Sequence, residues 1–384
     1  MNNRLPIGID DFAIAQNYYY VDKTLFIKDL VESHLGKSVL ITRPRRFGKS
    51  LTLSMLEHFF DISKSGASLF KDKKIAAYKD ICSQYASSYP VVRLNMKNIN
   101  GGSAKEIIDK AIDSISSLYR DYSFLQDDAS LFDVEKKYYL DVANKRLENV
   151  YEYQSSLLKL TAFLKTHYGK KVLLLIDEYD TPLESAFENG SYQECIGFFK
   201  ELFSQALKGN QNVFLSIITG VLQISKESLF SGLNNLEVLS VIDDAAAEYF
   251  GFTEAEVIEM MNQFNIDKTL DEIRDWYGGY HYGDKEMYNP WSIINLMGNG
   301  AIRQYWVNTG TNLLLQKLVS NETVFDSVNG EREVKINTSL SYLDFASDEN
   351  AVFSYLIQAG YFDLVIICGL KFLPWMKQKT LQKM

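Results

Sequence analysis

One octapeptide carries the residue types that could hold a phosphate group: Arg43-Pro44-Arg45-Arg46-Phe47-Gly48-Lys49-Ser50. It follows the apolar run 38–42, which predicts a buried strand, and precedes an apolar stripe at helical spacing that begins at Leu51. Strand, loop, Gly-Lys-Ser and helix is the layout of a phosphate-binding P-loop. Backbone N–H groups of such a loop converge on an anion with help from the helix dipole. Residues 43–51 are therefore predicted to contact a nucleotide.

Three residues of this loop have separate expected roles. Gly48 allows the backbone to approach the phosphates, Lys49 would reach the β- and γ-phosphates, and the Ser50 hydroxyl would hold Mg²⁺. The motif asks for glycine where this chain has Arg43. The alternative is a chance Gly-Lys-Ser tripeptide at the start of a helix.

A second apolar run ends in two acids and supplies the chemistry that the loop lacks. Residues 171–176 predict a strand buried on both faces of a parallel sheet, and Asp177 and Glu178 follow it. Ligands of open α/β sheets collect at the carboxyl ends of the strands, which places these acids beside the loop. Asp177 is expected to hold Mg²⁺ through water, and Glu178 to activate the attacking water as general base. Without the P-loop, the same run would indicate only a strand entering a polar turn.

A third strand is predicted at 213–220, with Thr219 near its carboxyl end. Thr219 could contact the γ-phosphate or the attacking water as a catalytic sensor. It could equally be a β-branched strand end before a glycine turn.

The chain resembles the AAA-ATPase-like family of bacterial P-loop proteins, which often carry a PD-(D/E)XK nuclease-like domain at the C-terminus. Arginine at the first P-loop glycine position is usual in that family. The resemblance implies binding of ATP and its hydrolysis. It does not extend to nuclease activity, because no Asp-x(n)-Glu-x-Lys arrangement follows Tyr361. The matching segments are Leu5-Pro6-Ile7-Gly8, Tyr20-Val21-Asp22-Lys23-Thr24, the 43–50 loop, Leu175-Ile176-Asp177-Glu178-Tyr179-Asp180, Phe230-Ser231-Gly232-Leu233-Asn234-Asn235, Trp276-Tyr277-Gly278-Gly279-Tyr280, Tyr288-Asn289-Pro290-Trp291-Ser292 and Tyr305-Trp306-Val307-Asn308-Thr309.

Alternating strands and helices predict an α/β fold with a parallel sheet flanked by helices. The strand expected at 89–96 resembles the extra strand of the additional-strand, catalytic-glutamate type of P-loop NTPase, which suits Glu178 as base. We expect a P-loop ATPase core over residues 1–250, a small lid over 251–310 and a helical extension over 311–384.

The predicted lid begins with a capping box, in which Thr253 and Glu256 precede an amphipathic helix. A hairpin is expected over 282–288. Short helices followed by a hairpin suggest a winged-helix-like lid, which in the family would pack on the nucleotide edge of the core. The alternative is a scaffold module without nucleotide contact.

Several weaker candidates remain open. A charge that senses the γ-phosphate could come from Arg274, Arg303 or Lys226, although most such side chains make surface ion pairs. The cluster 280–282 (Tyr-His-Tyr) could line the base or form the aromatic core of the hairpin. Asp22 and Lys23 match the family pattern and could lie by the adenine pocket.

Composition restricts the class of protein. A net charge of −9 argues against a surface coated with positive charge for nucleic acid, although a local basic groove remains possible. The three cysteines form no CxxC pair and the four histidines show no ligand spacing, which fits a reducing cytoplasm without a zinc site. No apolar run reaches the length of a membrane span. The chain is therefore expected to be a cytoplasmic protein with ATP and Mg²⁺ as ligands.

Two functions follow. The first is an ATPase in which a lid couples turnover to motion. The second is a nucleotide-gated module that binds a protein or nucleic acid with little turnover. A phosphotransferase using the same loop is a weaker third reading, because nothing in the chain marks an acceptor site.

Overall fold

The computed structural model describes most of the chain. The described residues are 4–64, 66–224, 229–230, 233–306, 336–337, 340–346, 348–367 and 371–376.

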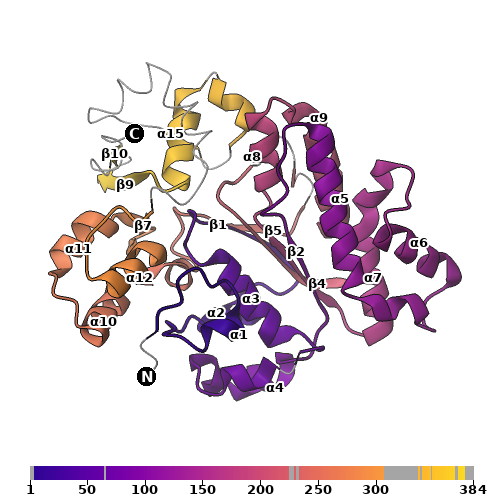
Figure 1. Cartoon of the computed structure of the whole chain (residues 1–384), viewed down its shortest axis with the longest axis horizontal. Coiled ribbons are helices and arrows are strands. Elements are labelled where there is room, and N and C mark those ends of the chain that lie inside the picture. Colours follow the sequence, from indigo (N-terminus) through magenta and orange to yellow (C-terminus); the bar gives the residue numbers. More distant parts are fainter. Residues whose placement is uncertain are drawn as a thin grey trace.

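A five-stranded parallel sheet forms the centre of the molecule, in the order β2-β3-β4-β1-β5 (Figure 1). β4 lies between β1, which leads into the P-loop, and β3, which ends in the acids. β2 lies beyond β3 at one edge of the sheet. The strand inserted between the P-loop strand and the acidic strand is therefore β4, and the assignment of the extra strand to residues 89–96 was wrong. The strands are β1 (Ser38–Thr42), β2 (Val91–Asn95), β3 (Val172–Asp177), β4 (Val213–Gly220) and β5 (Leu236–Leu239).

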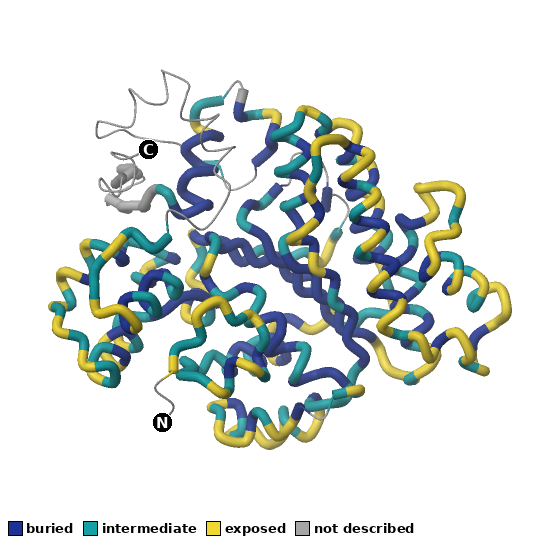
Figure 2. The backbone as a smooth tube through the Cα atoms, in the orientation of Figure 1, coloured by how far each residue is buried: buried dark blue, intermediate teal, exposed yellow. Residues whose placement is uncertain are grey.

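The strands read as continuous apolar runs because both faces of the sheet are covered. In β3, Leu174 and Ile176 face one hydrophobic cluster, whereas Leu173 and Leu175 face another. All six residues of β3 are buried, and the strands form the darkest part of the backbone in Figure 2. Burial on both faces is the usual state of a parallel sheet.

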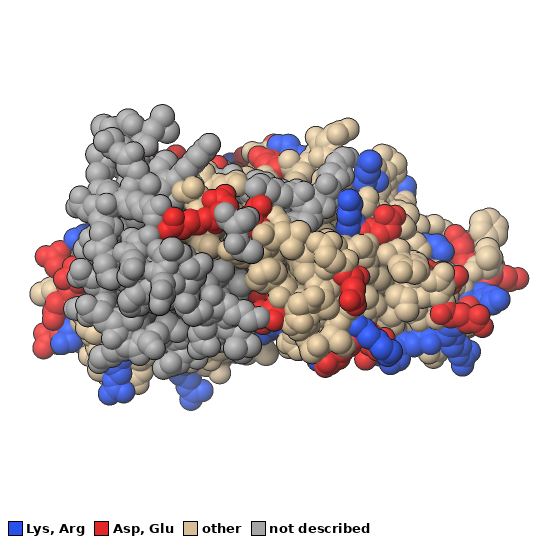
Figure 3. All heavy atoms as spheres, turned by 90° about the horizontal axis from the view of Figure 1, so that it is seen from above, with Lys and Arg blue, Asp and Glu red and all other residues tan. Residues whose placement is uncertain are grey.

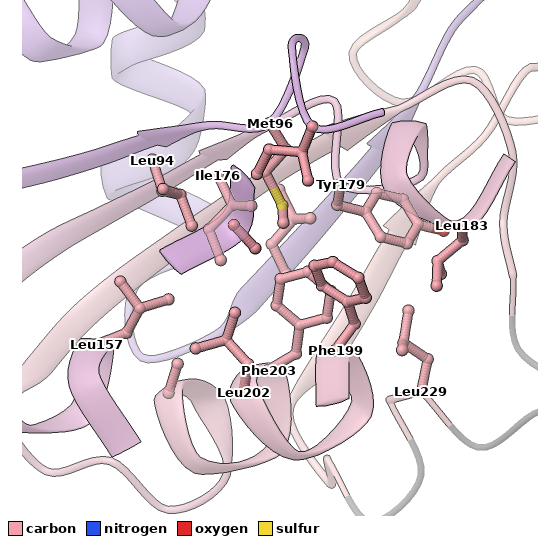
Figure 4. Close-up of a cluster of buried hydrophobic side chains, with 14 of the residues drawn as sticks. Leu94, Met96, Leu157, Ile176, Tyr179, Leu183, Phe199, Leu202, Phe203 and Leu229 are labelled. Carbon is pink, nitrogen blue, oxygen red and sulfur yellow. The ribbon is translucent and has the colours of Figure 1, made fainter. Parts of the chain in front are cut away.

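One face is covered by the helices that lie between the strands in sequence (Figure 1). Side chains of α7, α8 and α9 meet β2 and β3 in the cluster of Figure 4, where Phe199, Phe203 and Tyr179 are among the labelled residues. The elements of this layer are α5 (Ala104–Arg120), η3 (Ser123–Asp127), α6 (Asp133–Ala143), η4 (Val150–Ser155), α7 (Ser156–Tyr168), α8 (Thr181–Glu188) and α9 (Tyr192–Leu207).

The other face packs against the N-terminal helices and against the helix that follows the P-loop. The buried Phe59 and Phe60 of α3 belong to this cluster together with Val39 and Ile41 of β1. The elements are α1 (Phe12–Ala15), α2 (Leu25–Ser33), α3 (Lys49–Phe60), η1 (Gly66–Phe70), η2 (Lys74–Ala77) and α4 (Lys79–Tyr85).

A smaller body with its own apolar core follows the sheet. Its antiparallel sheet has the order β6-β8-β7, and the capping box of Thr253 and Glu256 is present at the start of α10. The predicted hairpin is present, but its first strand already begins at Tyr280. The elements are η5 (Ala247–Tyr249), β6 (Phe252–Thr253), α10 (Glu254–Phe264), α11 (Leu270–Tyr277), β7 (Tyr280–Tyr282), β8 (Lys285–Tyr288) and α12 (Pro290–Asn299).

The C-terminal region differs from the helical extension expected over 311–384. Its described part contains η6 (Tyr342–Ala346) and α15 (Glu349–Gln358), and then an antiparallel pair, β9 (Phe362–Ile367) and β10 (Lys371–Met376). β9 includes the run Leu-Val-Ile-Ile, whose β-branched residues favour a strand. No helix in the described ranges is both long and apolar enough to cross a membrane. Cys82 and Cys195 are free thiols, and Cys368 lies outside the described residues.

Candidate nucleotide-binding site

The 43–50 loop leaves β1 and turns sharply into α3. Gly48 is the N-cap of α3 and has a φ of 83°, in the left-handed region that glycine adopts without steric cost. Arg46 has a φ of 70° and therefore carries backbone strain of about 1–3 kcal/mol. The first N–H groups of a helix have no partner within the helix, and no side chain caps α3. The N-terminus of α3 is thus shaped to receive an anion.

The Lys49 side chain folds back over the start of this loop. Its Nζ donates hydrogen bonds to the carbonyl oxygens of Arg43 (2.9 Å) and Pro44 (3.0 Å). An ammonium group has three donors, so two carbonyls leave one N–H for a phosphate oxygen. Burial lowers the pKa of Lys49, and the carboxylates of Glu178 and Asp180 oppose that shift. The amine is therefore close to the acids at the end of β3, as the sequence predicted.

Asp177 ends β3 and is fully buried. Its Oδ1 accepts a hydrogen bond of 2.6 Å from the Thr219 hydroxyl, whereas its Oδ2 is buried without a hydrogen-bond partner. A buried carboxylate oxygen without a partner is costly unless a cation or water approaches it. This oxygen and the Ser50 hydroxyl are the kind of hard oxygen ligands that Mg²⁺ takes beside nucleotide phosphates, so the residues fit the metal.

Glu178 follows with a φ of 54°, a left-handed conformation that is unusual for glutamate. Its N–H donates to Thr219 Oγ1 (3.4 Å), and its Oε2 accepts from Thr181 Oγ1 (3.4 Å). Burial raises the pKa of Glu178, with Lys49 opposing and Asp177 adding to the shift. Strained backbone and a raised carboxyl pKa are features that cluster at catalytic sites.

Thr219 is fully buried between the two acids. Its hydroxyl donates to Asp177 and its carbonyl accepts the N–H of Tyr179. The structure therefore places Thr219 as the residue that orients Asp177, and its expected contact with the γ-phosphate or water stays a prediction.

Several loop side chains point into the protein. Arg43 is fully buried and donates to the carbonyls of Thr42 and Leu239 (both 2.8 Å), with its guanidinium 4.6 Å from the Tyr282 ring centroid. Burial lowers its pKa to about 10. Phe47 stacks edge-on against Tyr280 at 4.8 Å. Only the backbone of Arg43 and Phe47 is therefore available to a nucleotide. Leu51 also packs against the core, in the cluster beneath α3.

The remaining loop residues are held by other elements. Arg45 Nη2 pairs with Glu184 of α8 at 2.9 Å, and the Arg46 guanidinium lies 4.6 Å from the ring centroid of Trp291. Side chains of the loop therefore contact the sheet, α8 and the smaller body.

Comparison with known proteins agrees with this geometry. The chain matches the model of the AAA-ATPase-like family, described as "Predicted AAA-ATPase", over residues 6–230. That range is more than half of the 384 residues. The chain belongs to the AAA-ATPase-like family.

A curated relative of this AAA-ATPase-like protein comes from Azotobacter chroococcum mcd 1 and is named "Uncharacterized protein in vnfD 5'region". It is 30% identical over 362 residues, which cover 93% of this chain and 63% of that relative. The chain thus spans less than two thirds of the relative's length. Family membership suggests nucleotide binding, and it leaves the coupled partner unnamed.

The candidates for a γ-phosphate sensor lie apart from the loop contacts. Arg274 makes ion pairs with Glu254 (2.5 Å) and Asp271 (2.9 Å) on the smaller body. Arg303 is exposed, and Lys226 lies outside the described residues. None of the described contacts joins these arginines to the P-loop.

The aromatic cluster and the N-terminal pair have structural partners in the AAA-ATPase-like protein. Tyr280 and Tyr282 are buried in one cluster with Phe47, as expected for the core of the hairpin. Asp22 accepts from the backbone of Thr24 and of Lys74 (2.9 and 2.7 Å), and Lys23 pairs with Glu256 at 2.6 Å. These contacts fasten the N-terminal segment to η2 and to α10.

Sequence reasoning missed several residues that surround the loop. Asn289 and Trp306 donate to the Arg45 carbonyl (3.5 and 3.3 Å), and Gly360 lies so close to Pro44 that a Cβ there would be 3.0 Å away. Asn289 and Trp306 lie in segments that match the family pattern. The match to the family pattern was the one sign in the sequence that these two residues could matter, and it did not indicate what they contact.

The Arg45–Glu184 pair predicts a pH-dependent term in stability. Burial raises the pKa of Glu184 to about 7 from its ordinary 4.5, against the opposing charge of Arg45. The folded protein then binds this proton more tightly than the unfolded chain, so the stabilisation is full below pH 4.5 and is lost as pH rises through 7. Relative to Glu184→Gln, the free energy of unfolding of the native chain should fall by about 3 kcal/mol across this window. Urea unfolding of both proteins at several pH values measures it, and parallel pH profiles would contradict it.

Proposed function

We propose that this protein binds ATP with Mg²⁺ at residues 43–51 and hydrolyses it to ADP and phosphate. The observation that carries the proposal is the convergence of Lys49, Asp177 and Glu178 at the carboxyl ends of β1 and β3, with one Asp177 oxygen buried without a hydrogen bond. A cation-binding oxygen, a phosphate-binding amine and a carboxylate suited to be a base are the parts that phosphoryl transfer to water needs.

Each residue has a defined task in this proposal. Backbone N–H groups of the loop and the Lys49 amine bind the β- and γ-phosphates. Ser50 and Asp177 hold Mg²⁺, which neutralises phosphate charge when bound. Thr219 fixes Asp177 through their 2.6 Å hydrogen bond.

Glu178 would carry out the proton transfer. Its carboxylate accepts a proton from the attacking water, the water oxygen bonds to the γ-phosphorus, and the bond from that phosphorus to the ADP oxygen breaks. Burial raises the Glu178 pKa, against the opposing charge of Lys49, toward the range in which a base is efficient at neutral pH.

A nucleotide-gated binding module is the second candidate. It is favoured by the contacts that the loop makes with distant parts of the chain, since Trp306 bonds the Arg45 carbonyl and Phe47 packs on Tyr280. A change in the loop on nucleotide binding would reach the smaller body directly. Among the described residues on the face shown in Figure 3, positive and negative side chains are interspersed, so this view favours no nucleic-acid partner. The scattered cysteines support a cytoplasmic setting for either function.

The purified chain with ATP separates these functions. Phosphate release that requires Mg²⁺ and stops with EDTA supports the ATPase, and the same assay with GTP reports base preference. Tight binding of Mg-ATP without phosphate release would support the gated module instead. Failure to bind any nucleotide would contradict both.

A further inference from the structure

Arg93 is a charged residue on a sheet face whose core is formed by apolar side chains. It lies on β2, opposite Leu175 of β3, and it faces α3 together with Val91. Its side chain is only 20% exposed. Charged groups are seldom buried to this degree without partners, so its contacts are informative.

The Arg93 guanidinium joins the two residues expected to hold the metal. Its Nη2 lies 3.1 Å from the Ser50 carbonyl oxygen and 3.7 Å from Asp177 Oδ2, the oxygen that has no hydrogen bond. The other terminal nitrogen pairs with Glu57 of α3 at 3.0 Å. The Arg93 charge is thus shared between Asp177 and Glu57, and Glu57 also pairs with Lys64 Nζ at 2.7 Å.

We propose that Arg93 is the counter-ion of Asp177 in the nucleotide-free protein and that its charge weakens Mg²⁺ binding until ATP is present. This inference rests on the proposed function. A divalent cation at Asp177 is repelled by the guanidinium, which Glu57 neutralises only in part because it also pairs with Lys64. ATP phosphates bring the negative charge that overcomes this repulsion, so Mg²⁺ enters with the nucleotide.

Two substitutions change this balance in opposite directions. Arg93→Met removes the positive charge and leaves both carboxylates, so Mg²⁺ should bind more tightly. Glu57→Gln removes the carboxylate that pairs with both Arg93 and Lys64 and leaves the guanidinium to Asp177, so Mg²⁺ should bind more weakly. At this distance one unit of charge changes cation affinity by about tenfold.

The test is ATP binding by isothermal titration calorimetry over a range of Mg²⁺ concentrations, with EDTA as the metal-free point. The quantity compared is the Mg²⁺ concentration that gives half of the maximal increase in ATP affinity. We expect this concentration to fall about tenfold in Arg93→Met and to rise in Glu57→Gln. Arg93→Lys keeps the charge and should stay near the native value. Arg146→Met, at an exposed arginine after α6, is the matched control. ATP affinity in EDTA should change little in any variant.

Two outcomes would overturn the inference. One is an unchanged Mg²⁺ midpoint in Arg93→Met, and the other is a shift of the same sign in Arg93→Met and Glu57→Gln. If Arg93→Met does not fold, as judged by circular dichroism, Glu57→Gln and Arg93→Lys decide the matter. Absence of ATP binding by the native chain would contradict the proposed function itself, which is a different result.

Discussion

Replacing Glu178 by glutamine is expected to lower kcat for ATP hydrolysis by about 10²–10⁴-fold, while ATP affinity changes by less than about threefold. Glutamine keeps the size of the side chain and can still accept from Thr181, which lies 3.4 Å from Glu178 Oε2. It cannot take the proton of the attacking water. Steady-state phosphate release together with calorimetric ATP binding measures the two quantities separately.

The control for this substitution is Glu194→Gln, at an exposed glutamate on α9. Because the Glu178 pKa is raised, its carboxylate form is lost on acidification at a pH above the ordinary 4.5. The rate of ATP hydrolysis by the native chain should therefore decline as the pH falls through the Glu178 pKa. The residual rate of Glu178→Gln should not show this decline. ATP turnover by Glu178→Gln close to the native rate would show that Glu178 is not the general base.

Replacing Lys49 by methionine is expected to weaken ATP binding by about a hundredfold or more. The Lys49 side chain is buried in the loop, where a charged partner lost from a phosphate costs about 2–5 kcal/mol. Methionine keeps the length and apolar packing of the side chain, so the protein should stay folded. Isothermal titration with Mg-ATP measures the loss, and thermal unfolding without nucleotide checks the fold.

Lys105→Met is the control, at a lysine on α5 whose side chain is 85% exposed. It should bind Mg-ATP as the native chain does. Affinity of Lys49→Met within about threefold of the native value would place the nucleotide elsewhere.

The sheet and the catalytic candidates could be predicted from the sequence because their signals are local. β3 is an apolar run that ends in Asp177, and β1 runs into Gly48-Lys49-Ser50. Parallel pairing then brings these ends to one edge of the sheet, which is a rule of the fold. The third strand was also predicted, but the bond from Thr219 to Asp177 depends on β4 lying beside β3.

The surroundings of the loop could not be predicted, because their partners are distant in sequence. Arg43 appears from the sequence to be a phosphate ligand, yet its side chain is held by the Leu239 carbonyl and the Tyr282 ring. Arg93 and Glu184 appear as ordinary charged residues of a strand and a helix. Only the packing of β2 and α8 around the loop shows that both contact site residues.

The most direct test of the account is the identity of the nucleotide that stays with the protein after incubation with Mg-ATP and removal of the free nucleotide by rapid gel filtration. Chromatography of the denatured samples should recover ADP from the native chain, ATP from Glu178→Gln and almost no nucleotide from Lys49→Met. Recovery of ADP from Glu178→Gln in the native amount, or of equal nucleotide from Lys49→Met, would contradict the central claim.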